Sequence, residues 1–231
     1  MDLYFAPLAC STATRIAIYE AGADARFIEV DTKAKRIIDG GDYRAVNPLG
    51  YVPAMRTDDG EILTENAAIL QYVASRFAAA DLAPGDGIER ARLQSWLSFI
   101  GTELHKGLFI PLLDRKAPEE AKTYAREKYR PRLDYLNDYL TGREFLLDRF
   151  SVADAYLTVV LNWSRATSLD FEEWPALKDY FSRMRRRPSI ARALAEEGAL
   201  FVKEQGRNKA AGSSIQAGGW LRGHAPPSSR S

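Results

Sequence analysis

The hydrophobic pattern of the chain changes early in its length, and this change limits the folds available to it. Up to Phe77, short apolar runs alternate with helical spacing, which is typical of strands that alternate with helices. From Ile88 to about Ala199 the strand pattern is lost and long helical stretches follow one another. The length of 231 residues allows two small domains. We therefore predict an α/β domain at 1–78 and an all-helical domain at 88–200.

The expected elements of the first domain follow the order βαβ and then ββα. Strands are expected at 3–5 and 26–31, with a helix at 11–21 between them. A strand, helix and strand of this length predict a parallel pair with a right-handed crossover. An Asp-Gly pair at 59–60 lies between two apolar runs, which is a strong hairpin signal. Polar residues at 64–66 then suit the start of another helix.

The second domain contains a helix start that the sequence marks clearly. In SVAD at 151–154 an acid follows a serine by three residues, a variant of the capping box that pairs the free amides of a helix N-terminus. The residues at 155–163 are apolar on nearly every side, so we expect this helix in the middle of a bundle. Beyond the bundle, residues 206–231 are rich in Gly, Ser, Pro and Ala, which predicts a disordered tail.

Charge and composition argue against several classes of partner. The formal charge is +1, whereas nucleic-acid binding needs a concentrated basic face. The basic run at 183–187 directly precedes Pro188, and we interpret it as a helix C-terminus, where cations are favoured. No apolar run reaches the ~18 residues of a membrane span, and the first residues do not resemble a signal peptide. We therefore expect a cytoplasmic protein without a nucleic-acid or membrane partner.

Cys10 is the only cysteine in the chain, and it lies where the first strand turns into the first helix. With one cysteine and two histidines, neither an internal disulfide nor a zinc site is expected, and we predict no metal. A helix N-terminus carries about half a positive charge, which would stabilise a thiolate. We therefore predict a functional thiol with a lowered pKa, and inert burial is the alternative. A dithiol cycle is excluded because no second cysteine follows.

Two further stretches contain groups that suit a peptide ligand. Pro53 cannot donate to a sheet ladder and is expected at a strand edge or start. A cis Val52–Pro53 bond would turn the Val52 amide and carbonyl outward to pair with an extended peptide, whereas a trans bond would make an ordinary turn. Glu65 could face an ammonium and Asn66 could hold a carboxylate. Alternatively, Asn66 merely caps the helix.

Taken together, these stretches resemble the cytosolic glutathione transferases. The segments that match the family's motifs, in the family's order, are YFAPLACS at 4–11, NPLGYVPAM at 47–55, DDGEILTENAAILQYVA at 58–74 and SVADAYL at 151–157. The resemblance implies the glutathione transferase fold, an α/β thioredoxin-like N-terminal domain with an all-α C-terminal helical bundle domain. Cys10 and LHKGLFIPLL at 104–113 are most similar to the bacterial beta class.

The resemblance also implies roles for individual residues around the glutathione sulfur. Cys10 would lie beside that sulfur, and the backbone of Val52 would pair with the cysteinyl part of glutathione. Pro53 would be cis. His105 would assist Cys10 or the bound thiol, although a histidine among apolar helix residues is otherwise a satisfied core residue.

The two ends of glutathione are assigned in the same way. Glu65 and Asn66 would bind the γ-glutamyl end, and Lys35 would reach the glycine carboxylate. Many relatives have Ser, Thr or Gly at the position of Asn66, but asparagine also offers an amide donor.

The expected function is glutathione transfer in detoxification. The enzyme would favour the thiolate of glutathione, which attacks a small hydrophobic electrophile held by the helical domain in a cleft between the domains. The resemblance further implies a homodimer. One alternative is thiol–disulfide exchange, dehalogenation or peroxide reduction through Cys10. Another is a non-catalytic interaction module on the same fold.

Overall fold

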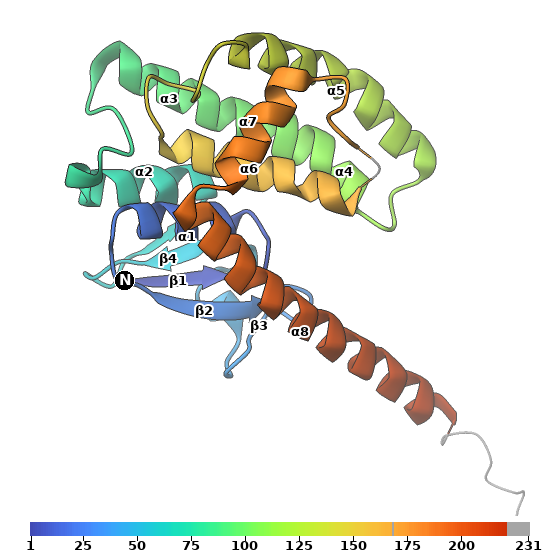
Figure 1. Cartoon of the computed structure of the whole chain (residues 1–231). Helices are drawn as coiled ribbons and strands as arrows, with labels where there is room; N and C mark the ends of the chain where they lie inside the picture. The colour runs from blue at the N-terminus through green and yellow to red at the C-terminus, as the bar shows by residue number, and fades with distance from the viewer. Residues whose placement is uncertain (168, 221–231) are drawn as a thin grey trace, which may run out of the picture.

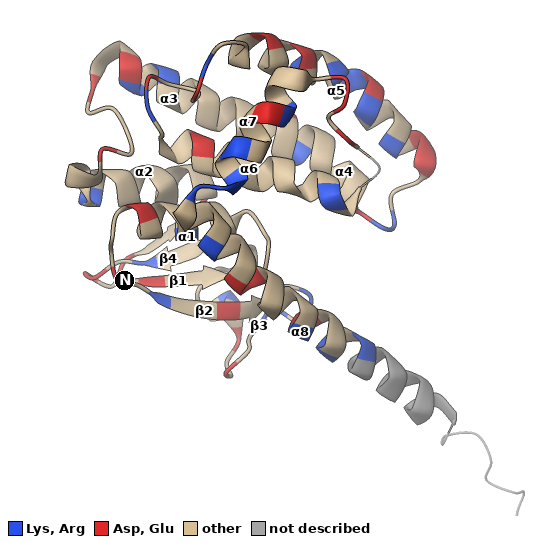
Figure 2. Ribbon diagram, viewed as in Figure 1, with Lys and Arg blue, Asp and Glu red and all other residues tan. Residues whose placement is uncertain are grey.

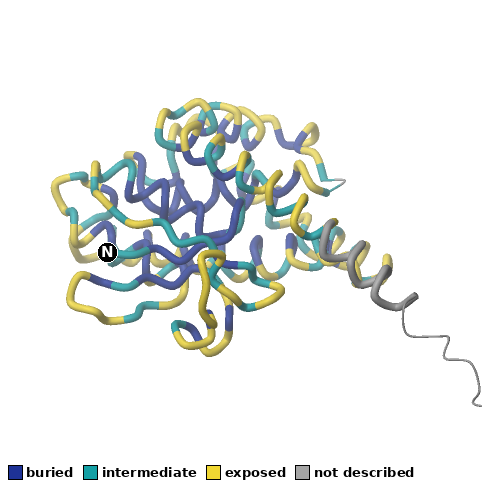
Figure 3. The backbone as a smooth tube through the Cα atoms, turned by 90° about the horizontal axis from the view of Figure 1, so that it is seen from below, coloured by how far each residue is buried: buried dark blue, intermediate teal, exposed yellow. Residues whose placement is uncertain are grey.

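The protein, described here as a computed structural model, has an α/β domain and a helical domain that pack against each other (Figure 1). The structure describes the backbone of residues 1–167 and 169–220, with side chains up to residue 209. One hydrophobic core continues from the first domain into the second. Figure 3 shows the buried segments gathered in the interior and exposed ones around them.

The first domain is built on a five-stranded sheet in the order β3-β2-β1-β4-β5. Its strands are β1 (Asp2–Phe5), β2 (Arg26–Asp31), β3 (Arg36–Ile37), β4 (Ala54–Arg56) and β5 (Ile62–Thr64). β1 and β2 are parallel, and the other neighbouring pairs are antiparallel. The predicted parallel pair and the β4–β5 hairpin are therefore confirmed. The sequence did not predict β3, because two residues are too few to show a period.

Helices cover one face of the sheet and a short turn covers the other. The helical elements of this domain are α1 (Ser11–Glu20), η1 (Tyr43–Ala45), α2 (Asn66–Arg76) and η2 (Ala78–Ala80). Successive strand residues face opposite sides of a sheet. Leu3 and Phe5 of β1 accordingly join the main core with α1 and α2, whereas Tyr4 packs with Tyr43 in a smaller cluster. α1 and α2 lie between the sheet and the helical domain (Figure 1).

The helical domain follows η2 in the chain. Its elements are α3 (Gly87–Phe99), η3 (Ile100–Phe109), α4 (Ile110–Leu113), α5 (Glu119–Leu140), α6 (Val152–Asn162), η4 (Trp163–Ala166), α7 (Pro175–Arg185) and α8 (Pro188–Trp220). η3 is a π-helix, a rare form that is frequent at functional sites. Within the described residues, no helix combines the length and the apolarity of a membrane span.

The predicted capping box at the start of α6 is present. Asp154 accepts hydrogen bonds from the backbone and the hydroxyl of Ser151, both at 2.9 Å. Its other oxygen accepts from the Leu146 amide at 2.9 Å and the Tyr180 hydroxyl at 2.8 Å. All α6 residues are buried except the last, Asn162. This confirms the prediction that the helix lies in the middle of the bundle.

The end of the chain differs from the expectation. Residues 206–231 are predicted to be a disordered tail, but α8 continues through the first part of this segment to Trp220. The remaining residues, 221–231, lie outside the described part. Basic and acidic positions are interspersed over both domains (Figure 2).

Candidate functional site

A cavity of about 400 Å³ lies between the two domains. Its lining includes all the residues predicted for the site except Lys35, namely Cys10, Val52, Pro53, Glu65, Asn66 and His105. The ammonium of Lys35 instead donates to the Gly50 carbonyl at 2.9 Å and lies 5.0 Å from the ring centre of Tyr51. Tyr51 itself lines the cavity, so Lys35 contacts a residue of the cavity wall.

Cys10 caps the N-terminus of α1 and faces the cavity. Its thiol donates to the Val52 carbonyl, with a sulfur–oxygen distance of 3.4 Å. Burial raises the pKa of Cys10 to about 12, although Lys106 and the amides of Cys10 and Ser11 act in the opposite direction. The predicted lowering of this pKa is wrong. A helix N-terminus contributes at most about 2 kcal/mol, which is less than the cost of burying a charged sulfur.

The segment before β4 presents an unpaired peptide group. The Val52–Pro53 bond is cis, as the resemblance implies. In the described part of the chain, the Val52 amide has no acceptor and its carbonyl receives only the Cys10 thiol. The neighbouring Tyr51 carbonyl is held by Tyr43 Oη and Asn47 Nδ2, both at 2.8 Å. This support fixes the peptide group at the cavity wall.

Asn66 brings a buried donor to the opposite side of the cavity. It is the first residue of α2, and Glu65 occupies the capping position, so the alternative of Asn66 as a helix cap is not observed. Asn66 Oδ1 accepts from Thr14 Oγ1 at 3.0 Å. Asn66 Nδ2 is buried and forms no hydrogen bond of normal geometry with the described residues, although the Asn66 side chain lies near the Tyr156 hydroxyl. A buried donor without an acceptor costs free energy, which a ligand oxygen would recover.

His105 lies on η3 and is held in one orientation. Its Nδ1 lies 2.7 Å from the Tyr156 hydroxyl, and its ring packs edge-on against Trp163 with 4.8 Å between the ring centres. Burial and the nearby Lys106 charge lower the pKa of His105 to about 4. The imidazole is therefore neutral at pH 7. Burial also raises the pKa of Tyr156, so its hydroxyl can donate to Nδ1, which leaves the imidazole proton on Nε2.

A second cavity, of about 490 Å³, shares Cys10 and His105 with the first. Most of its wall is apolar and includes Leu8, Ile110, Leu113 and Trp163. The thiol and the imidazole thus belong to a wall that the two cavities share. Apolar pockets with a few polar groups are the usual form of small-molecule sites.

The loop that carries Cys10 is anchored by the helical domain. Leu8 has a positive φ of 57°, its amide donates to Glu197 at 2.8 Å, and its carbonyl accepts from the Trp163 indole at 2.8 Å. Glu197 is fully buried and also binds Thr12 Oγ1 at 2.7 Å and Arg15 Nε at 2.8 Å. These contacts join residues that are far apart in sequence, so no local pattern indicates them.

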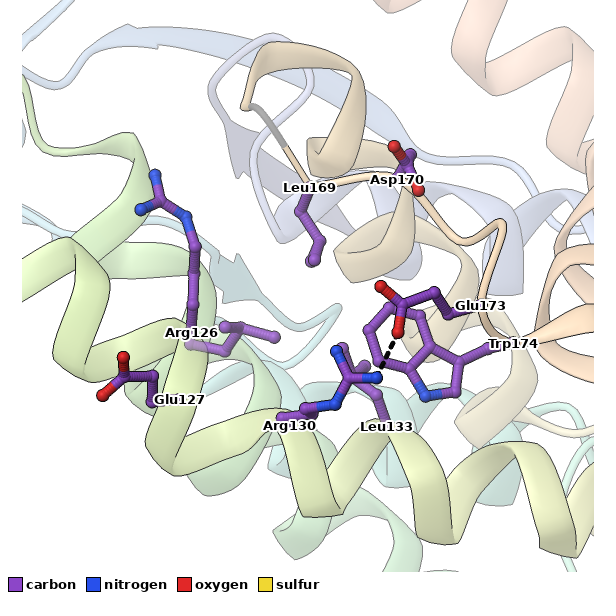
Figure 4. A pocket seen from close by; sticks show the side chains of 9 residues that line it. Arg126, Glu127, Arg130, Leu133, Leu169, Asp170, Glu173 and Trp174 are labelled. Atoms are coloured by element: carbon purple, nitrogen blue, oxygen red, sulfur yellow. Dashed lines mark hydrogen bonds and ion pairs between the residues drawn. The ribbon is translucent and has the colours of Figure 1, made fainter.

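A different cavity, of about 260 Å³, lies beside α5 and contains none of these residues. Arg130 and Glu173 form an ion pair there, close to Trp174 (Figure 4). No thiol or histidine is among its lining residues. In the described part of the chain there is also no cluster of His, Cys, Asp and Glu that could hold a metal ion.

The lining residues of the first cavity that the sequence reasoning missed include Asn47, Tyr51, Lys106 and Tyr156. Lys106 directly follows His105, and its position in the same motif was the available signal. Tyr156 is part of SVADAYL but looks like a core residue in that apolar helix.

Comparisons with known proteins agree with this architecture. Residues 9–76 match the family described as "Glutathione S-transferase, N-terminal domain", and residues 99–188 match "Glutathione S-transferase, C-terminal domain". The chain is 42% identical over 200 residues to glutathione S-transferase GstA of Escherichia coli O157:H7, which covers 86% of this chain and 99% of the relative.

Two solved structures are similarly close. The structure of a sphingomonad glutathione S-transferase complexed with glutathione has a TM-score of 0.82 at 43% identity, with 86% of this chain and 99% of that chain covered. The bacterial beta class glutathione S-transferase of Sphingomonas chungbukensis has the same TM-score, identity and coverage of both chains.

Proposed function

Because the chain belongs to the glutathione S-transferase family and is a glutathione transferase, we propose that glutathione binds in the 400 Å³ cavity with its sulfur beside Cys10. The observation that carries this proposal is the junction of the two cavities at Cys10 and His105. One cavity offers groups for a peptide, and the other offers an apolar wall. A nucleophile and an electrophile held in them would meet at the thiol.

Each part of glutathione has a counterpart in the lining or, for Lys35, beside it. The Val52 amide and carbonyl pair with the cysteinyl residue as a short β-bridge. Asn66 Nδ2 donates to the γ-glutamyl carboxylate, and Glu65 faces the ammonium group. Lys35, held near the cavity by Gly50, turns toward the glycine carboxylate. Asn66 Nδ2 and the Val52 amide are unpaired in the described part of the protein alone, whereas Lys35 would leave the Gly50 carbonyl.

Cys10 acts as a hydrogen-bond donor in this proposal. A thiol whose pKa is about 12 stays protonated at neutral pH, so the nucleophile is the sulfur of glutathione. The Cys10 S–H leaves the Val52 carbonyl and donates to the glutathione thiolate, which Lys106 also stabilises by its charge. The neutral His105 adds an N–H donor where charge develops on the electrophile.

The reaction is a displacement at the electrophilic carbon. The glutathione proton goes to solvent, the sulfur–carbon bond forms, and the leaving group departs with its bonding electrons. Holding both reactants at the shared wall of the two cavities lowers the entropic cost of their encounter.

Exchange, dehalogenation or peroxide reduction through Cys10 requires a Cys10 thiolate. The raised pKa of Cys10 favours transfer over these alternatives. A non-catalytic module is set aside because the chain is a transferase.

We also propose that the enzyme is a cytoplasmic homodimer that acts in detoxification. Support for the dimer comes from apolar side chains exposed on α3 and α5. Ile88 is 67% exposed and Tyr135 is 52% exposed, and Tyr135 stacks on Trp96. A contiguous patch of exposed apolar side chains is typical of an interface, and Tyr135 would form part of such a patch.

Cys10→Ser and Cys10→Ala variants test the role of the thiol. Conjugation of glutathione to a chromogenic aryl halide should survive largely in Cys10→Ser, which keeps a donor, and fall by about 10-fold or more in Cys10→Ala, which loses a hydrogen bond to an ion. Reduction of a glutathione mixed disulfide should be assayed in parallel. The wild type should reduce it no faster than Cys10→Ser does. Loss of all conjugation in a folded Cys10→Ser protein would instead show that the protein thiol is the nucleophile.

A further inference from the structure

The apolar cavity contains a charged side chain that the proposed reaction does not use. Arg165 lies on η4, two residues after Trp163, and it is the only Lys, Arg, Asp or Glu among the lining residues. Its side chain is exposed. Among the described residues, no acid forms an ion pair with it and no oxygen accepts from it. Arg165 is therefore available to a ligand.

A second guanidinium increases the positive charge at this place. Arg185 on α7 is close enough to Arg165 for the two charges to repel, and this repulsion, after burial, lowers the pKa of Arg185. Arg185 Nε is buried without a hydrogen-bond partner in the described part of the chain. Two like charges without a neutralising acid favour an anion beside them.

The charge and the reacting group come from different elements of the cavity wall. Cys10 and His105 lie where the cavity meets the glutathione site, whereas Arg165 comes from η4, with Phe201 of α8 also in the lining. A volume of about 490 Å³ suits a small ring with substituents. Trp163 and Phe201 offer aromatic surfaces to such a ring.

We propose that the preferred electrophile is an aromatic compound that carries a carboxylate, and that Arg165 binds this carboxylate while the reacting carbon faces the glutathione sulfur. This inference rests on the proposed function of the second cavity. A planar guanidinium can form two parallel hydrogen bonds to a carboxylate. In the reaction the sulfur–carbon bond forms, the carbon–halogen bond breaks, the halide leaves with the electron pair, and the carboxylate is unchanged.

The test compares two substrates that have the same ring and shape, a charged chloronitrobenzoate and the neutral chloronitrobenzamide, in which an NH₂ group replaces one carboxylate oxygen. For each, kcat/KM is divided by the uncatalysed rate with glutathione. In Arg165→Gln we expect this ratio to fall by about 10-fold or more for the benzoate, as for a lost hydrogen bond to an ion, and to change less than about 2-fold for the benzamide. For the benzoate, the ratio measured with Arg165→Lys should lie between those of the wild type and Arg165→Gln.

A control variant and an inhibitor complete the design. Arg44→Gln removes an exposed arginine on η1, outside both cavities, and should leave both substrates unaffected. Unreactive benzoate should inhibit the wild type competitively with the electrophile and inhibit Arg165→Gln about 10-fold more weakly. Equal effects of Arg165→Gln on benzoate and benzamide would overturn the role of Arg165. Failure of the wild type to convert either substrate would overturn the assignment of the cavity to the electrophile.

Discussion

Replacing Asn66 with aspartate should remove one donor from the glutathione site and leave the anchoring of the side chain intact. Asn66 Oδ1 accepts from Thr14 Oγ1 at 3.0 Å, and an aspartate oxygen can take the same bond. The buried, unpartnered Nδ2 is lost, and the aspartate oxygen that replaces it would also repel the γ-glutamyl carboxylate. A hydrogen bond to a charged group contributes about 1.5–3 kcal/mol, so the KM for glutathione should rise by about 10- to 150-fold. Asn66→Ser, which keeps a hydroxyl donor, should raise the KM for glutathione less than Asn66→Asp does.

The assay is steady-state conjugation with glutathione, repeated with cysteinylglycine, the dipeptide that lacks the γ-glutamyl group. The wild type should bind the dipeptide weakly, and Asn66→Asp should handle the dipeptide as the wild type does, because the lost donor has no partner in that ligand. A ligand-specific loss separates recognition from damage to the fold. The reasoning is refuted if Asn66→Asp weakens both ligands equally, or if it leaves the KM for glutathione unchanged.

Three other changes test the packing that supports the site. Because burial lowers the pKa of His105 to about 4, the unfolded chain binds more protons than the native state below about pH 6.5, and this residue's contribution to stability is lost as the pH falls from there toward 4. From this residue alone, the free energy of unfolding measured by urea titration should therefore decrease by about 2–3 kcal/mol between pH 7 and about pH 4.5. His105→Asn should remove that part of the decrease. If the free energy of unfolding of the variant falls with pH as steeply as that of the wild type, the role of His105 is contradicted. Gly107→Ala would place a Cβ 2.3 Å from the Tyr129 ring and should lower the free energy of unfolding by about 1–3 kcal/mol. Gly198→Ala would place a Cβ with nothing within 4 Å and should raise the free energy of unfolding by up to about 1 kcal/mol. Similar effects of the two substitutions would count against the close contact at Gly107. Asp154→Ala leaves four buried donors unpaired and should cost about 3 kcal/mol or more, measured as a lower urea midpoint; a cost under about 1 kcal/mol would show that these bonds contribute little.

Local patterns in the sequence were enough to predict the helices and strands that carry the site residues. The β1–α1–β2 unit follows from apolar periods and from Gly22, whose φ of 60° suits a residue without a Cβ. The α6 cap follows from Ser151 and Asp154, which interact within one turn. The strand β3 and the π-helical form of η3 could not be predicted, because neither has a spacing of its own.

The chemistry of Cys10 depended on information that the sequence does not contain. Its place at a helix start was predicted correctly, but the cost of burial is set by residues from both domains. The same holds for Glu197, which binds the Leu8 amide from the far end of the chain. Residues 206–220 show a related limit, since their Gly- and Ser-rich composition suggested disorder where α8 continues.

The protonation state of Cys10 decides whether glutathione or the protein supplies the nucleophile. Because the chain has one cysteine, carbon-13 at the cysteine Cβ reports on Cys10 alone, and its NMR shift can be followed across pH with and without S-methylglutathione in the site. We expect the shift of a neutral thiol throughout the neutral and mildly alkaline range, in line with a pKa of about 12. A titration step near neutral pH would show a Cys10 thiolate and would contradict a mechanism in which Cys10 only donates a hydrogen bond to glutathione.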